Sequence, residues 1–495
     1  MQCIQRTALL SMFILSGFNV AIKNRLFSVH YLTCMKHYDA IIIGSGQAGV
    51  PLAKKLGKKG LKTAIIEKKF VGGTCINVGC TPTKSMVASA RVMHLAQTAK
   101  EVGIDVKDVR VDLKAVVKRK NKIVAQFRNG AEEGLKKTRN VDLLFGEASF
   151  VSNKEIKVAL QDKSVIHISA DKIFINTGAR PLIPGIEGLK DIDYLTSTTI
   201  MDVAEVPEHL LIVGASYISL EFGQLFKRFG SKVTVLEHAD TFLSREDDDV
   251  ANGIKTFLEN EKLKIYTNAT VEKFLPGEKQ ITATVKIDTA IKKITCSHVL
   301  IATGRTPNTE DLKLENTKIK TDKGYIKVND KLQTDEPGIY ALGDVKGGPA
   351  FTHISYNDHL IVYNNLYEGG NESIKNRMVP YTMFTDPQFA RVGINEKEAL
   401  QKKLDYKVAC MPMAHVARGI ETNETTGFIK AIVDSKTKQV LGAAVIGEQG
   451  GEIMSMLQLA MMGNISYDIL RTAVFAHPLY AEALNNLFMQ FDSDK

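Results

Sequence analysis

Near the start of the chain, apolar and polar residues follow the period of a strand and then that of a helix. The segment 38–43 (YDAIII) is apolar and β-branched, so it predicts a buried strand. A turn containing Gly44, Gly46 and Gly49 follows, then a helical stretch, then a second apolar strand that ends at Glu67. This order predicts one β-α-β unit.

The three glycines match the spacing G-x-G-x-x-G of a dinucleotide-binding turn. The first glycine permits the tight turn, the second lets backbone amides approach a pyrophosphate, and the third lets the helix pack on the strand. Glu67 stands where a carboxylate can accept hydrogen bonds from a ribose. Such a spacing also occurs by chance, so its weight depends on the residues around it.

The same pattern of strand, turn, helix and strand returns at residues 209–238. Gly214 begins the second turn, but Ser216 and Ser219 stand where further glycines are expected, and Glu237 ends the second strand. Serine is small enough to be tolerated there. The repeat therefore predicts two nucleotide sites, of which the second has the weaker fingerprint.

Two shorter echoes, IFINTGARP around Gly178 and VLIATGRTPNT around Gly304, predict apolar strands that enter tight turns. Asp344 follows another apolar strand in PGIYALGDV. After Phe351 the pattern changes to mixed strands and helices. The chain is therefore expected to be an α/β protein with two Rossmann-like domains and a C-terminal α+β domain.

The first 34 residues contain the apolar run 8–22, flanked by basic residues. Three interpretations remain open: Met35 is the true initiator, the segment is a targeting peptide, or it is a membrane anchor. We favour the first, because Met35 stands directly before the first strand, and the run is too short to span a bilayer comfortably.

Composition adds limits to this picture. The 495 residues are 44% hydrophobic, and the net charge of +9 is spread along the chain, so we expect a soluble protein that binds neither nucleic acid nor membrane. The basic run Lys114–Lys122 is interpreted as the solvated face of a helix. Six cysteines are too few for a disulfide scaffold of this length and favour a reducing, cytoplasmic location.

Two of those cysteines carry the candidate chemistry. Cys75 and Cys80 lie in VGGTCINVGCTPTK, shortly after the first nucleotide unit. Alone, a Cys-x4-Cys could be a metal clip or two buried hydrophobic residues. Beside a dinucleotide turn, the pair predicts a dithiol oxidoreductase with a redox-active disulfide, and we expect no resident metal.

Together these motifs resemble the flavoprotein disulfide reductases, the family of glutathione reductase, dihydrolipoamide dehydrogenase and mercuric reductase. The resemblance covers Tyr38 to about Phe488, and the motifs stand in the family's order. The stretches GCTPTKSMVASARV and HPLYAEALNNLF are similar to the mercuric-reductase-like branch that includes copper-reducing, reactive-chlorine-resistance flavoenzymes.

The resemblance implies domain limits and an FAD site. We expect an FAD domain at 35–185 that resumes at 291–350, an NAD domain at 186–290, and a dimerisation domain at 351–495. The residues expected to hold FAD are Gly44, Gly46, Gly49, Glu67, Thr74, Lys84, Ala148, Gly178 and Asp344.

The resemblance also implies the site of the nicotinamide nucleotide. The residues expected there are Gly214, Tyr217, Ile218, Glu221, Glu237 and Gly304, with Tyr217 as the flap that nicotinamide displaces. Lys84 is expected to pair with Glu221, because a buried ammonium needs a counter-charge. Glu237 accepts ribose hydroxyls but repels an extra phosphate, so NADH is favoured and NADPH remains possible.

By the same resemblance, Cys75 attacks substrate and Cys80 lies against the flavin. His477, oriented by Glu482, is the acid-base group and comes from the partner subunit of a homodimer. The chain ends FDSDK, without the vicinal cysteines of mercuric reductases. A disulfide or another oxidised metal ion such as copper is thus the expected substrate; dihydrolipoamide dehydrogenase is the alternative, and a non-catalytic flavin-binding redox sensor is a third.

Overall fold

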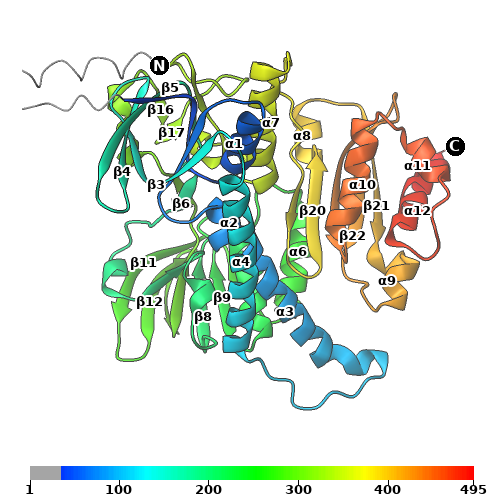
Figure 1. Cartoon of the computed structure of the whole chain (residues 1–495). Coiled ribbons are helices and arrows are strands. Elements are labelled where there is room, and N and C mark those ends of the chain that lie inside the picture. The colour runs from blue at the N-terminus through cyan, green and yellow to red at the C-terminus, as the bar shows by residue number, and fades with distance from the viewer. Residues whose placement is uncertain (1–34, 495) are drawn as a thin grey trace, which may run out of the picture. The chain divides into compact units, whose positions relative to one another are not determined.

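The structure of the protein, a computed structural model, describes residues 35–494. The interpretations of segment 1–34 therefore lie outside the described residues. Figure 1 shows three sheets in the described part: one around β3 to β5, one around β8 and β9, and one around β20 to β22 near the C-terminus. This arrangement confirms the expected fold class.

The first sheet is built around a parallel core. Its strands are β1 (Lys36–Ile43), β2 (Thr63–Glu67), β3 (Val141–Phe150), β4 (Glu155–Leu160), β5 (Val165–Ile175) and β18 (Ile339–Ala341). β1, β2 and the first half of β3 run parallel, while the second half of β3 pairs antiparallel with β4, as does β5. β18 pairs parallel with β5.

Both faces of β1 are buried, as expected for a parallel sheet covered on two sides. Ile42 packs in one cluster with Leu52 of helix α1 (Gly49–Lys58), and Ile41 packs in another with Phe150. The helices beside this sheet are α2 (Gly73–Val78), α3 (Cys80–Thr98), α4 (Leu113–Lys136) and α7 (Thr352–Tyr367).

The second sheet is fully parallel, with the order β10-β9-β8-β14-β7. Its strands are β7 (Tyr194–Thr196), β8 (His209–Val213), β9 (Lys232–Leu236), β10 (Lys264–Tyr266) and β14 (His298–Ile301). Helices α5 (Tyr217–Arg228) and α6 (Asp248–Asn260) belong to this part, as does an antiparallel meander of β11 (Ala269–Pro276), β12 (Ile281–Ile287) and β13 (Ala290–Cys296).

The third sheet is antiparallel, with the order β19-β20-β23-β22-β21. Its strands are β19 (Tyr381–Met383), β20 (Gln388–Gly393), β21 (Tyr406–Pro412), β22 (Phe428–Asp434) and β23 (Val440–Gly447). Its helices are α8 (Glu396–Gln401), α9 (Ala417–Glu421), α10 (Gly450–Met462), α11 (Tyr467–Thr472) and α12 (Ala483–Met489). Two small ribbons complete the described strands: β6 (Ala179–Pro181) with β15 (Arg305–Pro307), and β16 (Thr321–Asp322) with β17 (Tyr325–Ile326).

Three elements, β13, β14 and α7, lie or extend beyond the expected limit of the part to which they belong. β14 joins the second sheet between β8 and β7, although it follows the expected limit at residue 290. α7 packs with α1 of the first part, through Ile361 and Val362, although it follows the limit at residue 350. In both places the chain continues in the part it already occupies, and an apolar pattern does not show where it leaves that part.

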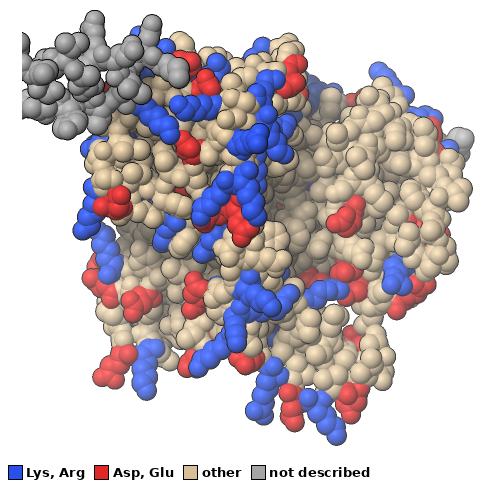
Figure 2. Space-filling model, viewed as in Figure 1, with Lys and Arg blue, Asp and Glu red and all other residues tan. Residues whose placement is uncertain are grey.

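Charge is mixed over the face shown in Figure 2, where Lys and Arg side chains are interspersed with Asp and Glu. On α4, the side chains of Lys114, Lys118 and Lys122 are exposed, which confirms a solvated basic helix face. Lys120 is the exception: it is buried, and its Nζ donates to the carbonyl oxygen of Met201 at 3.1 Å. Among residues 35–494, no helix combines the length and apolar character needed to cross a bilayer.

Candidate functional site

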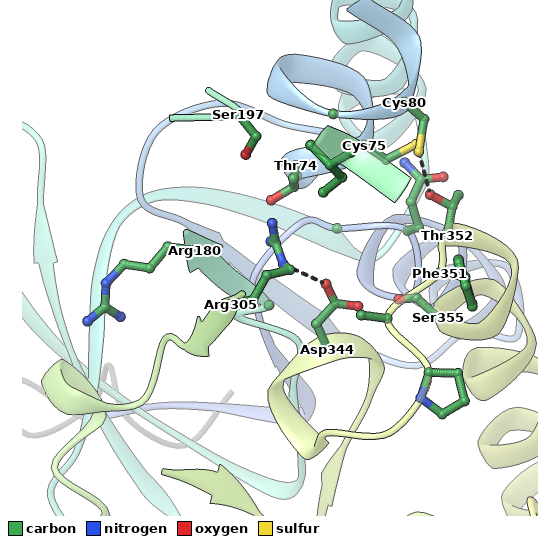
Figure 3. Close-up of a pocket in the computed structure, with 18 of the residues that line it drawn as sticks. Thr74, Cys75, Cys80, Arg180, Ser197, Arg305, Asp344, Phe351, Thr352 and Ser355 are labelled. Carbon is green, nitrogen blue, oxygen red and sulfur yellow. Dashed lines mark hydrogen bonds and ion pairs between the residues drawn. The ribbon is translucent and has the colours of Figure 1, made fainter. Parts of the chain in front are cut away.

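A cavity of about 2560 Å³ lies where the three parts of the structure meet. Its wall includes residues around both glycine turns, the two cysteines and the beginning of α7. Figure 3 shows Cys80 directed toward Thr352 in one region of the wall and Arg305 directed toward Asp344 in another.

The first glycine turn leaves no room for side chains. Gly44 has φ +100°, and a Cβ there would stand 2.3 Å from the carbonyl oxygen of Asn176. A Cβ on Gly46 would stand 2.9 Å from Oδ1 of Asn176, and one on Gly49 would stand 2.2 Å from the carbonyl oxygen of Gly44. The turn is therefore bare backbone, which is what close approach of a pyrophosphate requires.

Glu67, at the end of β2, holds this turn in place. Its Oε2 accepts hydrogen bonds from the backbone N–H of Ser45 at 3.1 Å and from the Ser45 hydroxyl at 2.5 Å. Its Oε1 accepts from the N–H of Lys69 at 2.8 Å. A carboxylate offers about four acceptor positions, so Glu67 can also accept from a ribose.

Gly44, Gly46 and Glu67 line the cavity, whereas Gly49 does not. The other residues expected to hold FAD line it too: Thr74 on α2, Lys84 on α3, Ala148 on β3, Gly178 and Asp344. Burial raises the pKa of Asp344, while Arg305, whose Nε lies 3.7 Å from its Oδ2, works in the opposite direction. The bare turn, Glu67 and a continuous wall down to the cysteines fit an adenine dinucleotide joined to a reactive ring.

The second turn repeats the first with one change. Gly214 has φ +98°, and Glu237 accepts from the backbone N–H groups of Ala215 at 2.8 Å and Ala239 at 3.0 Å. Ser219 is fully buried, and its Oγ has no hydrogen-bond partner among the described residues. Of the residues expected to hold the nicotinamide nucleotide, Tyr217, Ile218, Glu221 and Gly304 line the cavity, whereas Gly214 and Glu237 do not.

The two cysteines meet at the cavity wall as free thiols. Cys75 lies on α2, and Cys80 is the first residue of α3, exposed to the cavity, with Sγ 3.4 Å from Oγ1 of Thr352. The hydrogen bond from Cys75 lowers the pKa of Cys80 to about 6, with further help from the charge of Lys84 and from Thr352. The same hydrogen bond and burial raise the pKa of Cys75. Cys80 is therefore the thiolate of the pair at neutral pH.

Lys84 and Glu221 form the expected pair. The Lys84 Nζ lies 3.0 Å and 2.8 Å from the two carboxylate oxygens of Glu221, whose side chain is only 4% exposed. Glu221 also accepts from the backbone N–H of Phe384 at 2.8 Å, and the Lys84 Nζ lies 4.8 Å from the centre of the Phe384 ring. The ion pair thus joins α3 of the first part to α5 of the second at the level of the cysteines.

His477 and Glu482 lie away from this site. Nδ1 of His477 is 2.9 Å from Oε2 of Glu482, so the two side chains are paired as expected. Neither residue lines the cavity of its own chain, and the His477 side chain is 67% exposed. Within one chain, the structure does not bring the histidine to the cysteines.

Several residues on or near the cavity had not been predicted. Asn176 binds the first turn, Thr352 contacts Cys80, and Arg91 on α3 makes partly buried ion pairs with Asp386 and with Glu424, the latter at 2.9 Å. Asn176 had a usable signal, because it is a polar residue at the end of an apolar strand. Thr352 stands in no recognisable motif, and Arg91 lies in the stretch GCTPTKSMVASARV, which indicated a branch of the family but no role for this residue.

Comparison with known proteins agrees with this geometry. Residues 38–358 match the family model of the pyridine nucleotide-disulphide oxidoreductases, and residues 379–488 match the model of that family's dimerisation domain. The probable pyridine nucleotide-disulfide oxidoreductase RclA of Escherichia coli is 38% identical, with 92% of this chain and 99% of that protein aligned. A mercuric reductase of Staphylococcus aureus is 34% identical, over 92% of this chain and 83% of that enzyme.

A dihydrolipoyl dehydrogenase of Geobacillus stearothermophilus is 31% identical, over 90% of this chain and 94% of that enzyme. The solved structure described as the Cu(II) complex of the HOCl-induced flavoprotein disulfide reductase RclA from Escherichia coli superposes with a TM-score of 0.85 and 38% identity. It covers 92% of this chain and all of that one. The chain therefore belongs to the pyridine nucleotide-disulfide oxidoreductases, and it is a flavoprotein reductase that uses FAD and NAD(P)H.

Proposed function

We propose that this enzyme passes electrons from NADH to an oxidised metal ion or a disulfide through Cys75 and Cys80. The observation that carries the proposal is the position of Cys75 and Cys80 beside the Lys84–Glu221 pair, in a cavity reached by both nucleotide parts. In this setting the hydrogen bond from Cys75 lowers the pKa of Cys80 to about 6. FAD held by the first glycine turn, Glu67 and Asp344 would supply the ring that accepts a hydride and links the nicotinamide nucleotide to the cysteine pair.

The two cysteines then divide the chemistry. Cys75 attacks one sulfur of a disulfide substrate, and the other sulfur leaves as a thiol. Cys80 next attacks Sγ of Cys75, which releases the second substrate thiol and closes the Cys75–Cys80 disulfide, so two electrons leave the pair. A metal substrate instead accepts those two electrons from the two sulfurs, which are soft ligands suited to copper or mercury. One Hg(II) ion takes both electrons, whereas two Cu(II) ions take one each.

Cys75 needs a base, because its raised pKa keeps it protonated beside the Cys80 thiolate. His477 of the partner subunit is our candidate for that base, and Glu482 fixes its Nδ1. Since His477 is exposed and lies off the cavity of its own chain, the proposal requires a homodimer, and the match to the family's dimerisation domain supports it.

NADH is the proposed reductant. Glu237 places a carboxylate at the end of β9, where it would repel the additional phosphate of NADPH. We also propose a cytoplasmic location, because a reducing compartment suits a pair that must return to the dithiol form.

The substrate class follows the branch of the family. The similarity to RclA and to mercuric reductases favours an oxidised metal ion, and the RclA structure cited above is described as a Cu(II) complex. Dihydrolipoamide dehydrogenase remains the second candidate, because its chemistry uses two cysteines, a histidine and NADH in the same roles. A redox sensor without turnover is less well supported, since the Lys84–Glu221 and His477–Glu482 pairs are both intact.

The test is NADH oxidation by the purified flavoprotein with Cu(II), Hg(II), lipoamide or glutathione disulfide as acceptor. Cys75→Ser and Cys80→Ser should each lower metal-dependent turnover by about a hundredfold or more, because each removes one sulfur of the pair. Cys410→Ser is the matched control, since Cys410 is an exposed thiol on β21 outside the cavity. Faster turnover with lipoamide than with every metal would assign the chain to the second candidate, and turnover independent of both cysteines would refute the proposal.

A further inference from the structure

Four rings stack in a row along the cavity wall. Tyr217 stacks on Tyr381 with 5.4 Å between ring centroids, Tyr381 stacks on Phe351 at 5.6 Å, and Phe351 stacks on His353 at 5.3 Å. Tyr217 begins α5 of the second part, Tyr381 lies on β19 of the third, and Phe351 directly precedes α7. The row therefore joins segments from three parts of the structure.

The two tyrosines of this row share one carboxylate. Oε1 of Glu246 accepts from the hydroxyl of Tyr381 at 2.6 Å and from the hydroxyl of Tyr217 at 3.2 Å. Glu246 is 2% exposed, and Arg391 balances its charge, with Nη1 3.2 Å from Oε2. Burial raises the pKa of Tyr217 to about 12 and also raises that of Tyr381, so both hydroxyls remain donors.

The contacts of the two tyrosines are unequal. Tyr381 has the shorter bond to Glu246, a stacked neighbour on each side, and the edge of Phe389 at 6.0 Å. Tyr217 has the longer bond and stands at the end of the row, with Tyr381 as its stacked neighbour. Tyr381 is therefore the fixed ring and Tyr217 the ring that can leave.

We propose that Glu246, held by Tyr381 and Arg391, is a latch that keeps Tyr217 in its present position and so sets the affinity for the nicotinamide ring. This inference rests on the proposed function, in which NADH enters the cavity. Tyr217 lines that cavity one turn of α5 before Glu221, where an entering nicotinamide ring would displace it. Glu246 is a positioning residue here: it acts on the nucleotide through Tyr217. Its bond to Tyr217 is made only while the ring blocks the site.

The latch predicts an unusual effect of mutation: its removal should increase the affinity for nicotinamide nucleotides. A ligand that binds only the open form has an apparent Kd raised by the fraction of protein that is closed. Removing the latch increases the open fraction, so nicotinamide nucleotides should bind more tightly. A residue needed only for the integrity of the fold would produce weaker binding or no change.

The experiment is calorimetric titration of the FAD-loaded dimer with NAD⁺, which binds without turnover, and with ADP-ribose, which lacks the nicotinamide ring. Tyr217→Phe keeps the ring and removes the latch bond, and Glu246→Gln weakens it from the other side. Both variants should bind NAD⁺ up to about tenfold more tightly, the factor expected for one hydrogen bond to a charged group. Binding of ADP-ribose should stay within about twofold of the wild type, because that ligand does not require Tyr217 to move.

Tyr38→Phe is the matched control. Tyr38 is a buried tyrosine whose hydroxyl donates to Oδ2 of Asp142 at 2.8 Å, away from the cavity, so its variant should bind both ligands like the wild type. Unchanged or weaker NAD⁺ binding by Tyr217→Phe would overturn the latch, as would equal tightening for ADP-ribose. Tyr217→Phe tests the latch even if Glu246→Gln does not fold. A wild-type flavoprotein that binds no NAD⁺ would instead refute the proposed function.

Discussion

The two nucleotide turns are built on the same plan but are not equally rigid. In each, the first glycine donates its N–H to the end of the neighbouring strand: Gly44 to Ile66 at 2.8 Å, and Gly214 to Leu236 at 2.7 Å. In each, a glutamate at the end of that neighbouring strand accepts two backbone N–H groups beside the turn. The loops therefore share their backbone bonds, and they differ in the side chains that support them.

Asn176 is the main difference. Its Oδ1 accepts from the N–H of Gly49 at 3.0 Å, and its Nδ2 donates to the carbonyl oxygen of Leu342 at 2.9 Å. In the second part the equivalent strand end carries Ala302, which has only its backbone N–H to offer, to Val213 at 2.9 Å. The first turn is clamped and the second is not, which suits a prosthetic FAD on one side and an exchanging nucleotide on the other.

Gly49→Ala should have the largest effect, because it breaks the tighter turn itself. The new Cβ would stand 2.2 Å from the carbonyl oxygen of Gly44, so the backbone must shift. We expect a loss of about 2–3 kcal/mol in the free energy of unfolding together with poor FAD retention. Denaturant unfolding and the flavin-to-protein absorbance ratio measure the two.

Ser219→Ala is the matched change in the second turn. It removes a buried hydroxyl that has no partner among the described residues, so stability should stay equal or rise by about 1 kcal/mol, and FAD should be retained. Equal losses for the alanine variants of Gly49 and Ser219 would contradict the difference between the two turns.

Asn176→Ala should come next, because it gives the first turn the side chain of the second. Two hydrogen bonds disappear and leave the buried N–H of Gly49 and the carbonyl of Leu342 unpaired, a cost of about 2 kcal/mol. FAD should dissociate more readily, by roughly tenfold or more in Kd.

The control for that variant is Asn485→Ala. Asn485 donates to the carbonyl oxygens of Leu470, Arg471 and Ala473 in the third part, so its loss should lower stability without changing FAD affinity. If both asparagine variants released FAD to the same extent, the hydrogen bonds of Asn176 to the first turn would not explain FAD retention.

The smallest expected effect concerns the ion pair that joins the two parts. The cation of Lys84 lowers the pKa of Cys80, and the carboxylate of Glu221 raises it. Lys84→Met should therefore raise the pKa of Cys80 by about one unit, and Glu221→Gln should lower it. In the wild type, Cys80 is a thiolate above about pH 6 and a thiol below it. The long-wavelength thiolate-flavin absorbance of the reduced enzyme follows this change. Shifts of the same sign in both variants would contradict the opposite roles of the two charges.

Much of this was predictable from the sequence, because the repeated β-α-β pattern depends on local periodicity. Most of the cofactor residues were expected only because of the family resemblance, and three of them, Gly49, Gly214 and Glu237, do not line the cavity. Asn176 was missed although its signal was present: the echoes INTGARP and IATGRTP differ at that position. Comparing the two copies, instead of matching each to a motif, would have found it.

The rest depends on contacts that leave no local pattern. Tyr381 lies 135 residues from Glu246, and Arg391 lies 145 residues from it. Each is an ordinary residue of a short strand in its own segment. The places of β14 and α7 depend on such contacts too, because each extends a part that the chain already occupies beyond residue 290 or 350.

Helix α3 connects the chemistry to the mechanical stability of the molecule. Within three turns it carries the sulfur of Cys80, the ammonium of Lys84 and the guanidinium of Arg91, and the last two are tied to different parts of the protein. The helix is thus held by ion pairs at two points along its length, and the reactive sulfur belongs to its first residue. Loss of either ion pair would let helix α3 tilt and displace the Cys80 sulfur, and at Arg91 this would happen although no residue of the cavity wall had been replaced.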